Sequence, residues 1–195
     1  LFLTKGKGRL LKVINKIQDK LFEIPFIEKP LPNKLSIKKN PNYQADTYYR
    51  LHKKATNYKN IKVEQFIKKT KFSIDNDWFN EVSLITQTSI KNSDLNFNHG
   101  KILYSLLSEY IQNKSNSHNN NITVIETGSA RGFSALCMSK AIIDQRISGK
   151  IITIDCISHN KKTYWNCISD LEGEKTRQEL LNKWEKELSN IIFIQ

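Results

Sequence analysis

Two kinds of hydrophobic pattern alternate along the second half of the chain. Short runs of β-branched residues predict buried strands over 122–126, 151–155 and 191–194. Longer stretches with apolar residues at helical spacing predict helices over 133–146 and 174–188 between these strands. Strands that alternate with helices of this length are typical of βαβ units and a parallel sheet. The pattern therefore predicts an α/β fold.

Further helices are predicted upstream, over 61–71, 78–91 and 100–112. The last has the clearest helical spacing, with apolar residues at i, i+3, i+4, i+7 and i+8 from Leu103. Asp77 is the expected N-cap of the helix over 78–91, because a short side-chain oxygen at that place accepts from free amides of the first turn.

The front of the chain has a different character. Residues 9–22 predict a basic amphipathic helix, and the prolines of residues 24–43 predict an extended linker. Residues 43–59 are polar, with tyrosines interleaved among Arg and Lys. Aromatic side chains among cations can stack on nucleic acid. No RNA-binding signature accompanies them, so nucleic acid is not the expected partner.

Charge separates the same two parts. Residues 1–72 contain 18 Lys and Arg against 5 Asp and Glu, whereas residues 73–195 contain 13 against 14. The net charge of +12 therefore belongs to the front of the chain. Mean hydropathy is −0.52, and no apolar run approaches the roughly 20 residues of a membrane span. The three cysteines form no C-x-x-C pair and are expected to be reduced thiols.

A glycine-rich turn is the main candidate for chemistry. Glu126 closes the first strand, Gly128 and Gly132 follow within the turn, and Asp155 closes the second strand. Glycine lets a ligand approach the backbone, and the first amides of the next helix carry partial positive charge. A carboxylate after the second strand is the usual ribose acceptor of a βαβ nucleotide site. The dinucleotide fingerprint requires glycine where Ala130 stands, and no Gly-Lys-Ser/Thr closes a P-loop.

Glu126-x-Gly128-x-x-x-Gly132 followed by strand-Asp155 resembles the class I S-adenosylmethionine (SAM)-dependent methyltransferases, and in particular the small-molecule O-methyltransferase-like branch. The resemblance implies a Rossmann-like fold with strand order 3-2-1 for the strands present. It also implies a SAM site. Its expected cofactor-binding residues are Glu126, Gly128, Ser129, Gly132, Asp155 and Cys156. Glu126 would bind the ammonium, Asp155 the ribose hydroxyls, and Cys156 would flank the adenine.

The resemblance covers residues 98–195 and implies an incomplete domain. The family's sheet has seven strands in the order 3-2-1-4-5-7-6, of which only three are expected here. We therefore expect a basic, mostly helical extension over 1–72 and the N-terminal half of a methyltransferase domain over 73–195. Such a fragment is expected to be inactive alone. The family's catalytic groups usually follow strand four, so no catalytic residue is assigned.

The expected function is methyl transfer to a small molecule, a sugar or a lipid-linked glycan. An NAD(P)-dependent oxidoreductase with a Rossmann βαβ unit and a non-catalytic basic module that binds a membrane or macromolecule are the alternatives. No metal site is expected, because His118 has no second ligand at a suitable spacing. The expected location is the cytoplasm, with peripheral membrane contact through residues 9–22 as a further hypothesis. The oligomeric state is not predicted.

Overall fold

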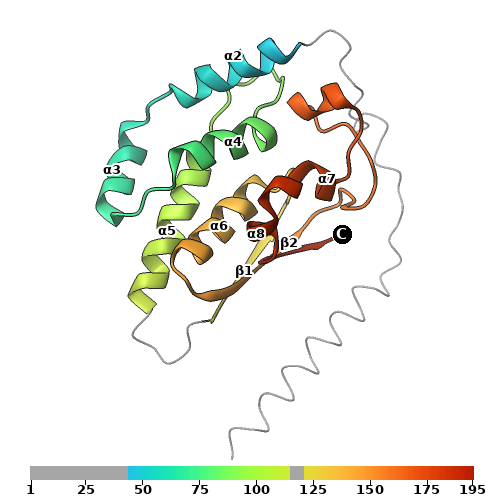
Figure 1. The fold of residues 1–195 in the computed structure, drawn as a ribbon. Coiled ribbons are helices and arrows are strands. Elements are labelled where there is room, and N and C mark those ends of the chain that lie inside the picture. The colour runs from blue at the N-terminus through green and yellow to red at the C-terminus, as the bar shows by residue number, and fades with distance from the viewer. Residues whose placement is uncertain (1–43, 115–120) are drawn as a thin grey trace, which may run out of the picture. The chain divides into compact units, whose positions relative to one another are not determined.

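A computed structural model describes residues 44–114 and 121–195 (Figure 1). The predicted helix over 9–22, the linker over 24–43 and His118 lie outside these residues. The helices are α2 Ala45–Thr56, α3 Ile61–Thr70, α4 Asn76–Thr86, α5 Asn98–Lys114, α6 Phe133–Asp144, α7 Arg177–Leu181 and α8 Glu185–Leu188. The strands are β1 Asn121–Thr127, β2 Ser148–Ile154 and β3 Ile191–Ile194, and two short 3₁₀ helices are η2 Ile168–Glu172 and η3 Asn182–Trp184.

The three strands form one parallel sheet in the order β1-β2-β3. Glu126 lies opposite Thr153, and Ile152 lies between Ile125 and Ile192. The mixed α/β class and the predicted strand order are confirmed. The architecture is compatible with part of a Rossmann-like fold, in which each helical connection returns the chain to the same end of the sheet.

Helix α6 lies at the centre of the core. Eight of its twelve residues are buried, including Phe133, Leu136 and Ile142. A helix that is apolar on most of its circumference is enclosed on several sides. Here α6 lies against β2 on one side and α5 on the other, and the Phe133 ring contacts Phe79 at 5.6 Å between centroids.

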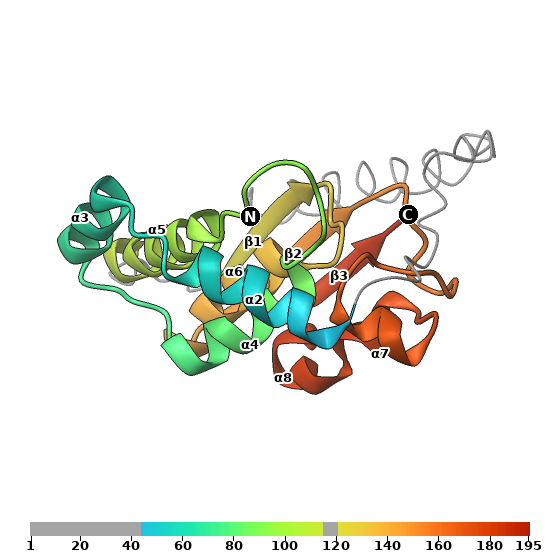
Figure 2. The same cartoon turned by 90° about the horizontal axis from the view of Figure 1, so that it is seen from above.

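The helices cover one face of the sheet, as Figure 2 shows. On the opposite face Ile125 is 70% exposed, and Ile154 and Ile192 are also exposed. Parallel strands usually read as continuous apolar runs because both faces are buried. Among the described residues, helices cover only one face of this sheet.

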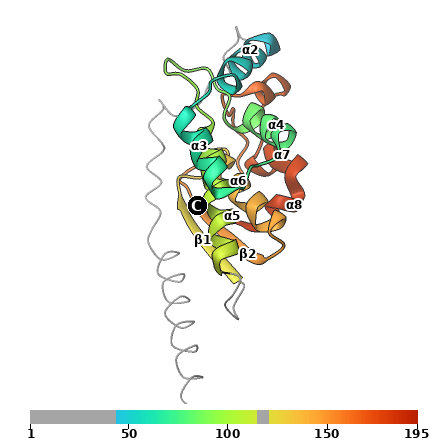
Figure 3. The same cartoon turned by 90° about the vertical axis from the view of Figure 1, so that its left-hand side faces the viewer.

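Two helices extend the helical layer outward. His52 of α2 hydrogen-bonds Ser83 of α4 at 2.9 Å between Nε2 and Oγ, and its ring stacks on Phe97. The chain after α3 is held to α5, because Ser105 Oγ donates to the Phe72 carbonyl at 2.7 Å. Figure 3 shows α2 and α3 at the outer side of α4 and α5. No helix among residues 44–114 and 121–195 is long and apolar enough to cross a membrane.

Three local predictions were wrong, and one helix was missed. The helix predicted over 78–91 begins at Asn76 and ends at Thr86. The N-cap of α4 is Asp75 and not Asp77, because Asp75 Oδ1 accepts from the Trp78 amide at 2.8 Å. The expected single helix over 174–188 divides into α7, η3 and α8. The polar stretch over 43–59, for which no helix was predicted, contains α2.

Substitution of Gly100 tests how closely α5 and α6 pack. A Cβ at Gly100 would lie 2.6 Å from the Phe133 ring and 2.9 Å from Cys137 Sγ. Gly100→Ala is expected to lower the free energy of unfolding by about 1–3 kcal/mol despite the better helix propensity of alanine, because the buried ring must move. Thermal or urea unfolding measures this change.

The control on the same helix is Leu106→Ala, whose side chain is 49% exposed. Its effect should be well below that of Gly100→Ala. A stabilised Gly100→Ala protein would contradict the packing of these two helices.

Candidate functional site at the carboxyl end of the sheet

The turn between β1 and α6 has three residues in the left-handed region. Gly128, Ala130 and Gly132 have φ of 87°, 43° and 88°. The Gly128 amide donates to the Ile154 carbonyl at 2.7 Å, so the turn starts beside the end of β2. A Cβ at Gly132 would lie 2.9 Å from Leu181, whereas a Cβ at Gly128 would meet nothing within 4 Å. The backbone angle at Gly132 therefore favours glycine, and a side chain there would also displace the end of the Leu181 side chain, whereas space remains open at Gly128.

Glu126 is bound by hydroxyl groups. Thr153 Oγ1 donates to Glu126 Oε2 at 2.6 Å, and Ser134 Oγ donates to Oε1. Ser129 is buried, and its hydroxyl lies 2.7 Å from Thr153 Oγ1. A continuous chain of hydrogen bonds thus joins the strand-end carboxylate to the glycine turn. Such a chain holds Glu126 in one orientation.

Asp155 also joins the turn. The Ala130 amide donates to Asp155 Oδ2 at 2.5 Å, and the Ile157 amide donates to Oδ1 at 2.9 Å. The Asp155 side chain is only 8% exposed. Its neighbour Cys156 is exposed. The structure therefore brings Glu126 and Asp155 to adjacent strand ends with one turn between them, and both carboxylates already have partners within the chain.

A buried arginine completes this cluster. Arg177 at the start of α7 is 1% exposed and lies 3.8 Å from Asp155 Oδ2. Its Nε donates to the Ala130 carbonyl at 2.9 Å, and its Nη2 donates to the Ile157 carbonyl at 3.1 Å. Burial lowers the pKa of Arg177, and the nearby Asp155 carboxylate opposes that shift. Arg177 thus clamps the glycine turn to the loop after β2.

Aromatic rings enclose the same guanidinium. Arg177 Cζ lies 5.0 Å from the centre of the Phe193 ring and 5.6 Å from that of Trp165. His159 stacks on Phe193 with 4.8 Å between ring centroids. Burial lowers the pKa of His159, and the positive charge of Arg177 lowers it further. The His159 imidazole is therefore biased toward its neutral form.

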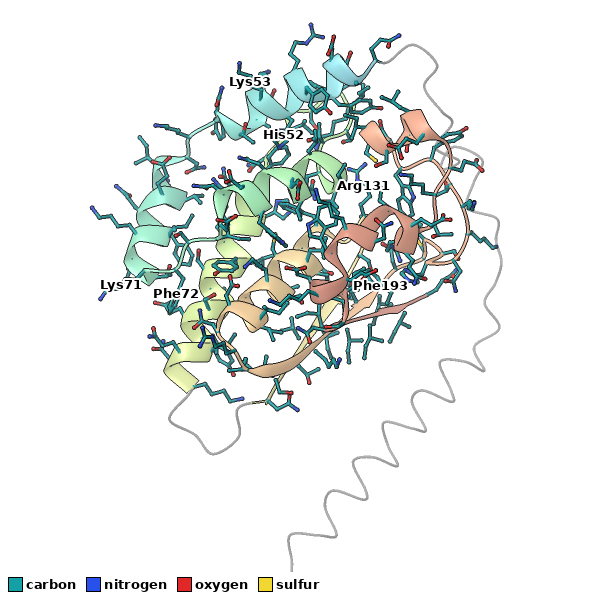
Figure 4. All side chains as sticks on the ribbon, viewed as in Figure 1. His52, Lys53, Lys71, Phe72, Arg131 and Phe193 are labelled. Carbon is teal, nitrogen blue, oxygen red and sulfur yellow. The ribbon has the colours of Figure 1, made fainter. Side chains whose placement is uncertain are left out.

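A second arginine, Arg131, holds the loops that border the turn. Its Nε donates to the Thr86 carbonyl at 2.6 Å, and its Nη1 donates to the carbonyls of Trp165 and Asn166. The Asn166 side chain in turn binds both backbone groups of Ile90. Figure 4 shows Arg131 in the interior between α4 and the loop that precedes α7. Sequence reasoning identified neither arginine.

Residues 164–166 belong to the long loop that follows β2. Trp165 is 2% exposed, and its indole Nε1 donates to the Lys175 carbonyl at 2.8 Å. Together with the Asn166 bonds to Ile90, this assigns Trp165 and Asn166 a packing role.

A cavity lies away from the glycine turn. It has a volume of about 520 Å³ and lies between α2 and the loop 89–96. Its walls include Leu51, Tyr58 and Lys91, and none of the six predicted cofactor-binding residues lines it. The Lys54–Asp94 ion pair at 3.1 Å crosses its rim.

Comparison with protein-family models, with curated proteins and with solved structures finds no match. Among residues 44–114 and 121–195, no group of three His, Cys, Asp or Glu side chains could hold a metal ion. The functional interpretation of the site therefore rests on its geometry.

Arg177 provides a direct test of the clamp. Arg177→Met is expected to lower the free energy of unfolding by about 3 kcal/mol or more, because it leaves two carbonyls and Asp155 without their buried cation. The matched control is Lys183→Met, which breaks the exposed ion pair between Lys183 and Glu81. That variant should lose less than about 1 kcal/mol. Equal losses in denaturant titrations would contradict the clamp.

Proposed function

We propose that this chain carries the cofactor-binding part of a SAM-dependent methyltransferase. Methyl transfer to a small molecule, a sugar or a lipid-linked glycan is the reaction class that we infer, and the residues of the turn and the strand ends are the proposed cofactor contacts. The proposal goes beyond the α/β fold itself, which hosts many unrelated activities.

One observation supports it most strongly. Two carboxylates at the ends of adjacent parallel strands connect to the same glycine turn, Asp155 through the Ala130 amide and Glu126 through Thr153 and Ser129. Ligands of open α/β sheets bind beyond the carboxyl ends of the strands. A ligand with an ammonium at one end and a ribose at the other needs two separated acceptors in this arrangement.

The turn fits such a ligand at Gly128. This residue is exposed, and the space where a side chain would stand is open. The first amides of α6 follow directly, and Gly132 at its N-cap position has no side chain to block them. Polar groups of a ligand that approached Gly128 would therefore meet free backbone donors.

The fit at Asp155 requires a rearrangement. Both carboxylate oxygens accept from amides, and little of the side chain is exposed. A carboxylate offers about four lone-pair sites, so the acceptor capacity for two hydroxyls remains. The carboxylate is not accessible to a ribose, however, because Arg177 and residues 155–157 enclose it. Ribose binding through Asp155 therefore requires the Asp155 side chain to turn out of this enclosure.

Bound SAM would supply the electrophilic methyl group, and the residues of this chain would supply binding and orientation. Glu126, held by Ser134 and Thr153, would fix the position of the ammonium. The turn would exclude water from one side of the ligand. No residue of the chain is assigned as the base that would accept a proton from the acceptor.

Isothermal titration calorimetry of the protein with SAM and with NAD tests the proposal. Heat of binding with SAM and none with NAD is the expected result. Binding of NAD alone would favour the oxidoreductase, in which the left-handed Ala130 would occupy the place of the fingerprint glycine. Absence of binding to either would remove the cofactor assignment.

Two glycines allow a matched test of the turn. Gly128 and Gly173 have φ of 87° and 110°, and a Cβ at either would meet nothing within 4 Å. Replacement by alanine should cost both proteins stability on the order of 1–3 kcal/mol, because the backbone angle disfavours a side chain. Only Gly128→Ala should also weaken SAM binding, by about tenfold or more, because its methyl group occupies the ligand's approach. Equal SAM affinity in the two variants would contradict contact at Gly128.

A further inference from the structure

The outer side of α2 and α3 concentrates positive charge. Residues 44–72 contain eight Lys and Arg against Asp46 and Glu64. All eight are exposed. Lys54 pairs with Asp94, and Lys71 follows the end of α3. The other six are Arg50, Lys53, Lys59, Lys62, Lys68 and Lys69. None of these six forms an ion pair with a carboxylate in the described part of the chain. Their charge is therefore available to a partner.

A lysine-rich composition does not explain this concentration. The composition is shared by the whole chain, yet residues 73–195 contain slightly more Asp and Glu than Lys and Arg. The excess over 44–72 is therefore part of the basic front of the chain, residues 1–72, and does not continue into residues 73–195.

Apolar side chains are exposed among the cations. Tyr49, Tyr58 and Ile61 are 53%, 58% and 69% exposed. The core does not require them, because α2 buries Tyr48 and α3 buries Thr70 instead. Cations mixed with exposed tyrosine and isoleucine differ from an ordinary solvated helix face, which is polar throughout.

The outward direction of this surface is visible in Figure 4. Lys53 lies at the outer side of α2 and Lys71 at the outer end of α3, whereas His52 lies on the inner side. Residues 49, 50 and 53 share one face of α2, because positions three and four apart are neighbours on a helix. Residues 61, 62, 65, 68 and 69 share a face of α3 for the same reason. We call the exposed side chains of residues 49–69 the α2–α3 surface.

We propose that the α2–α3 surface docks on an anionic phospholipid bilayer. Each lysine near an anionic membrane surface contributes about 1 kcal/mol, and tyrosine is favoured at the level of the headgroups. Ile61 supplies an apolar group that can enter the boundary between headgroups and acyl chains. The combination of point charges with inserted apolar groups gives stronger attachment than either feature alone.

The residue types favour a membrane over a nucleic acid. Five of these six cations are lysines, which act as compact point charges. Recognition of phosphates and bases in nucleic acids relies more on the planar fork of arginine. Ile61, the most exposed apolar side chain of the surface, offers no ring on which a base could stack.

Co-sedimentation with vesicles tests the proposal on the whole chain. The protein should bind vesicles of phosphatidylcholine with phosphatidylglycerol, should not bind vesicles of phosphatidylcholine alone, and should dissociate as salt is raised. A triple variant with Lys53→Gln, Lys59→Gln and Lys62→Gln should bind about 100-fold more weakly, since each lysine contributes roughly fivefold. Ile61→Ser leaves the charge unchanged and should weaken binding about tenfold.

The matched control removes three lysines from the other basic segment. Lys12→Gln, Lys16→Gln and Lys20→Gln lower the net charge by the same amount, and this variant should keep most of the binding. Thermal melting should show that the variants at Lys53, Lys59, Lys62 and Ile61 fold as the unmodified protein does, since these side chains are exposed. The same measurement checks the folding of the control variant. Loss of binding only in the control variant would overturn the proposal in favour of residues 9–22.

Two further outcomes would also overturn it. The first is vesicle binding that is unchanged by both the triple variant and Ile61→Ser. The second is binding of a single-stranded oligonucleotide, measured by fluorescence anisotropy, without binding of anionic vesicles at the same ionic strength. The SAM titration of the same variants should be unaffected, so the membrane proposal and the cofactor proposal fail separately.

Discussion

The buried guanidinium of Arg177 is the interaction on which the carboxyl end of the sheet depends. It binds the Ala130 carbonyl of the glycine turn and the Ile157 carbonyl of the loop after β2, while it lies beside Asp155 and between two aromatic rings. A buried cation is tolerated only where its donors are satisfied. Here the donors of Arg177 bind Ile157, 20 positions earlier in the sequence, and Ala130, 47 positions earlier. Arg131 does the same for the neighbouring loops. Two arginines therefore give an irregular region the rigidity that the strands give to the sheet.

The local parts of the fold could be predicted from the sequence because their signals are local. The β-branched runs and the position of the glycine turn follow from short-range pattern, whereas the strand order was implied by the family resemblance. The convergence of Glu126 and Asp155 on one turn followed from the same reasoning. The bounds of α3, α5 and α6 differ from those predicted by at most two residues at each end.

The missed features depend on contacts across the fold. Arg177 lies at the start of a segment whose apolar spacing predicts one amphipathic helix, and nothing local marks it as buried. Its partners come from elements that only the folded chain brings together. Helix α2 did carry a usable signal, because Tyr48, Leu51 and Ala55 recur at helical spacing and face inward. The tyrosines and lysines between them obscured it. Lys183 illustrates the same limit, since it pairs with Glu81 rather than with Glu179 on its own segment.

The geometry at Asp155 determines which hydrogen bonds must break before the proposed cofactor can bind. At 3.8 Å the contact between Arg177 and Asp155 is longer than a hydrogen bond, and the guanidinium's close partners are the two carbonyls. If Asp155 turned toward a ribose, Arg177 would therefore keep its hydrogen bonds. The direct losses would be the amide bonds from Ala130 and Ile157. Ribose hydroxyls would replace those donors on the carboxylate, but the two amides would need new acceptors. The Ala130 amide lies in the turn that a ligand would approach, so a ligand's own polar atoms are the natural replacement for its partner. A site of this kind closes on itself when empty and exchanges internal hydrogen bonds for external ones when filled.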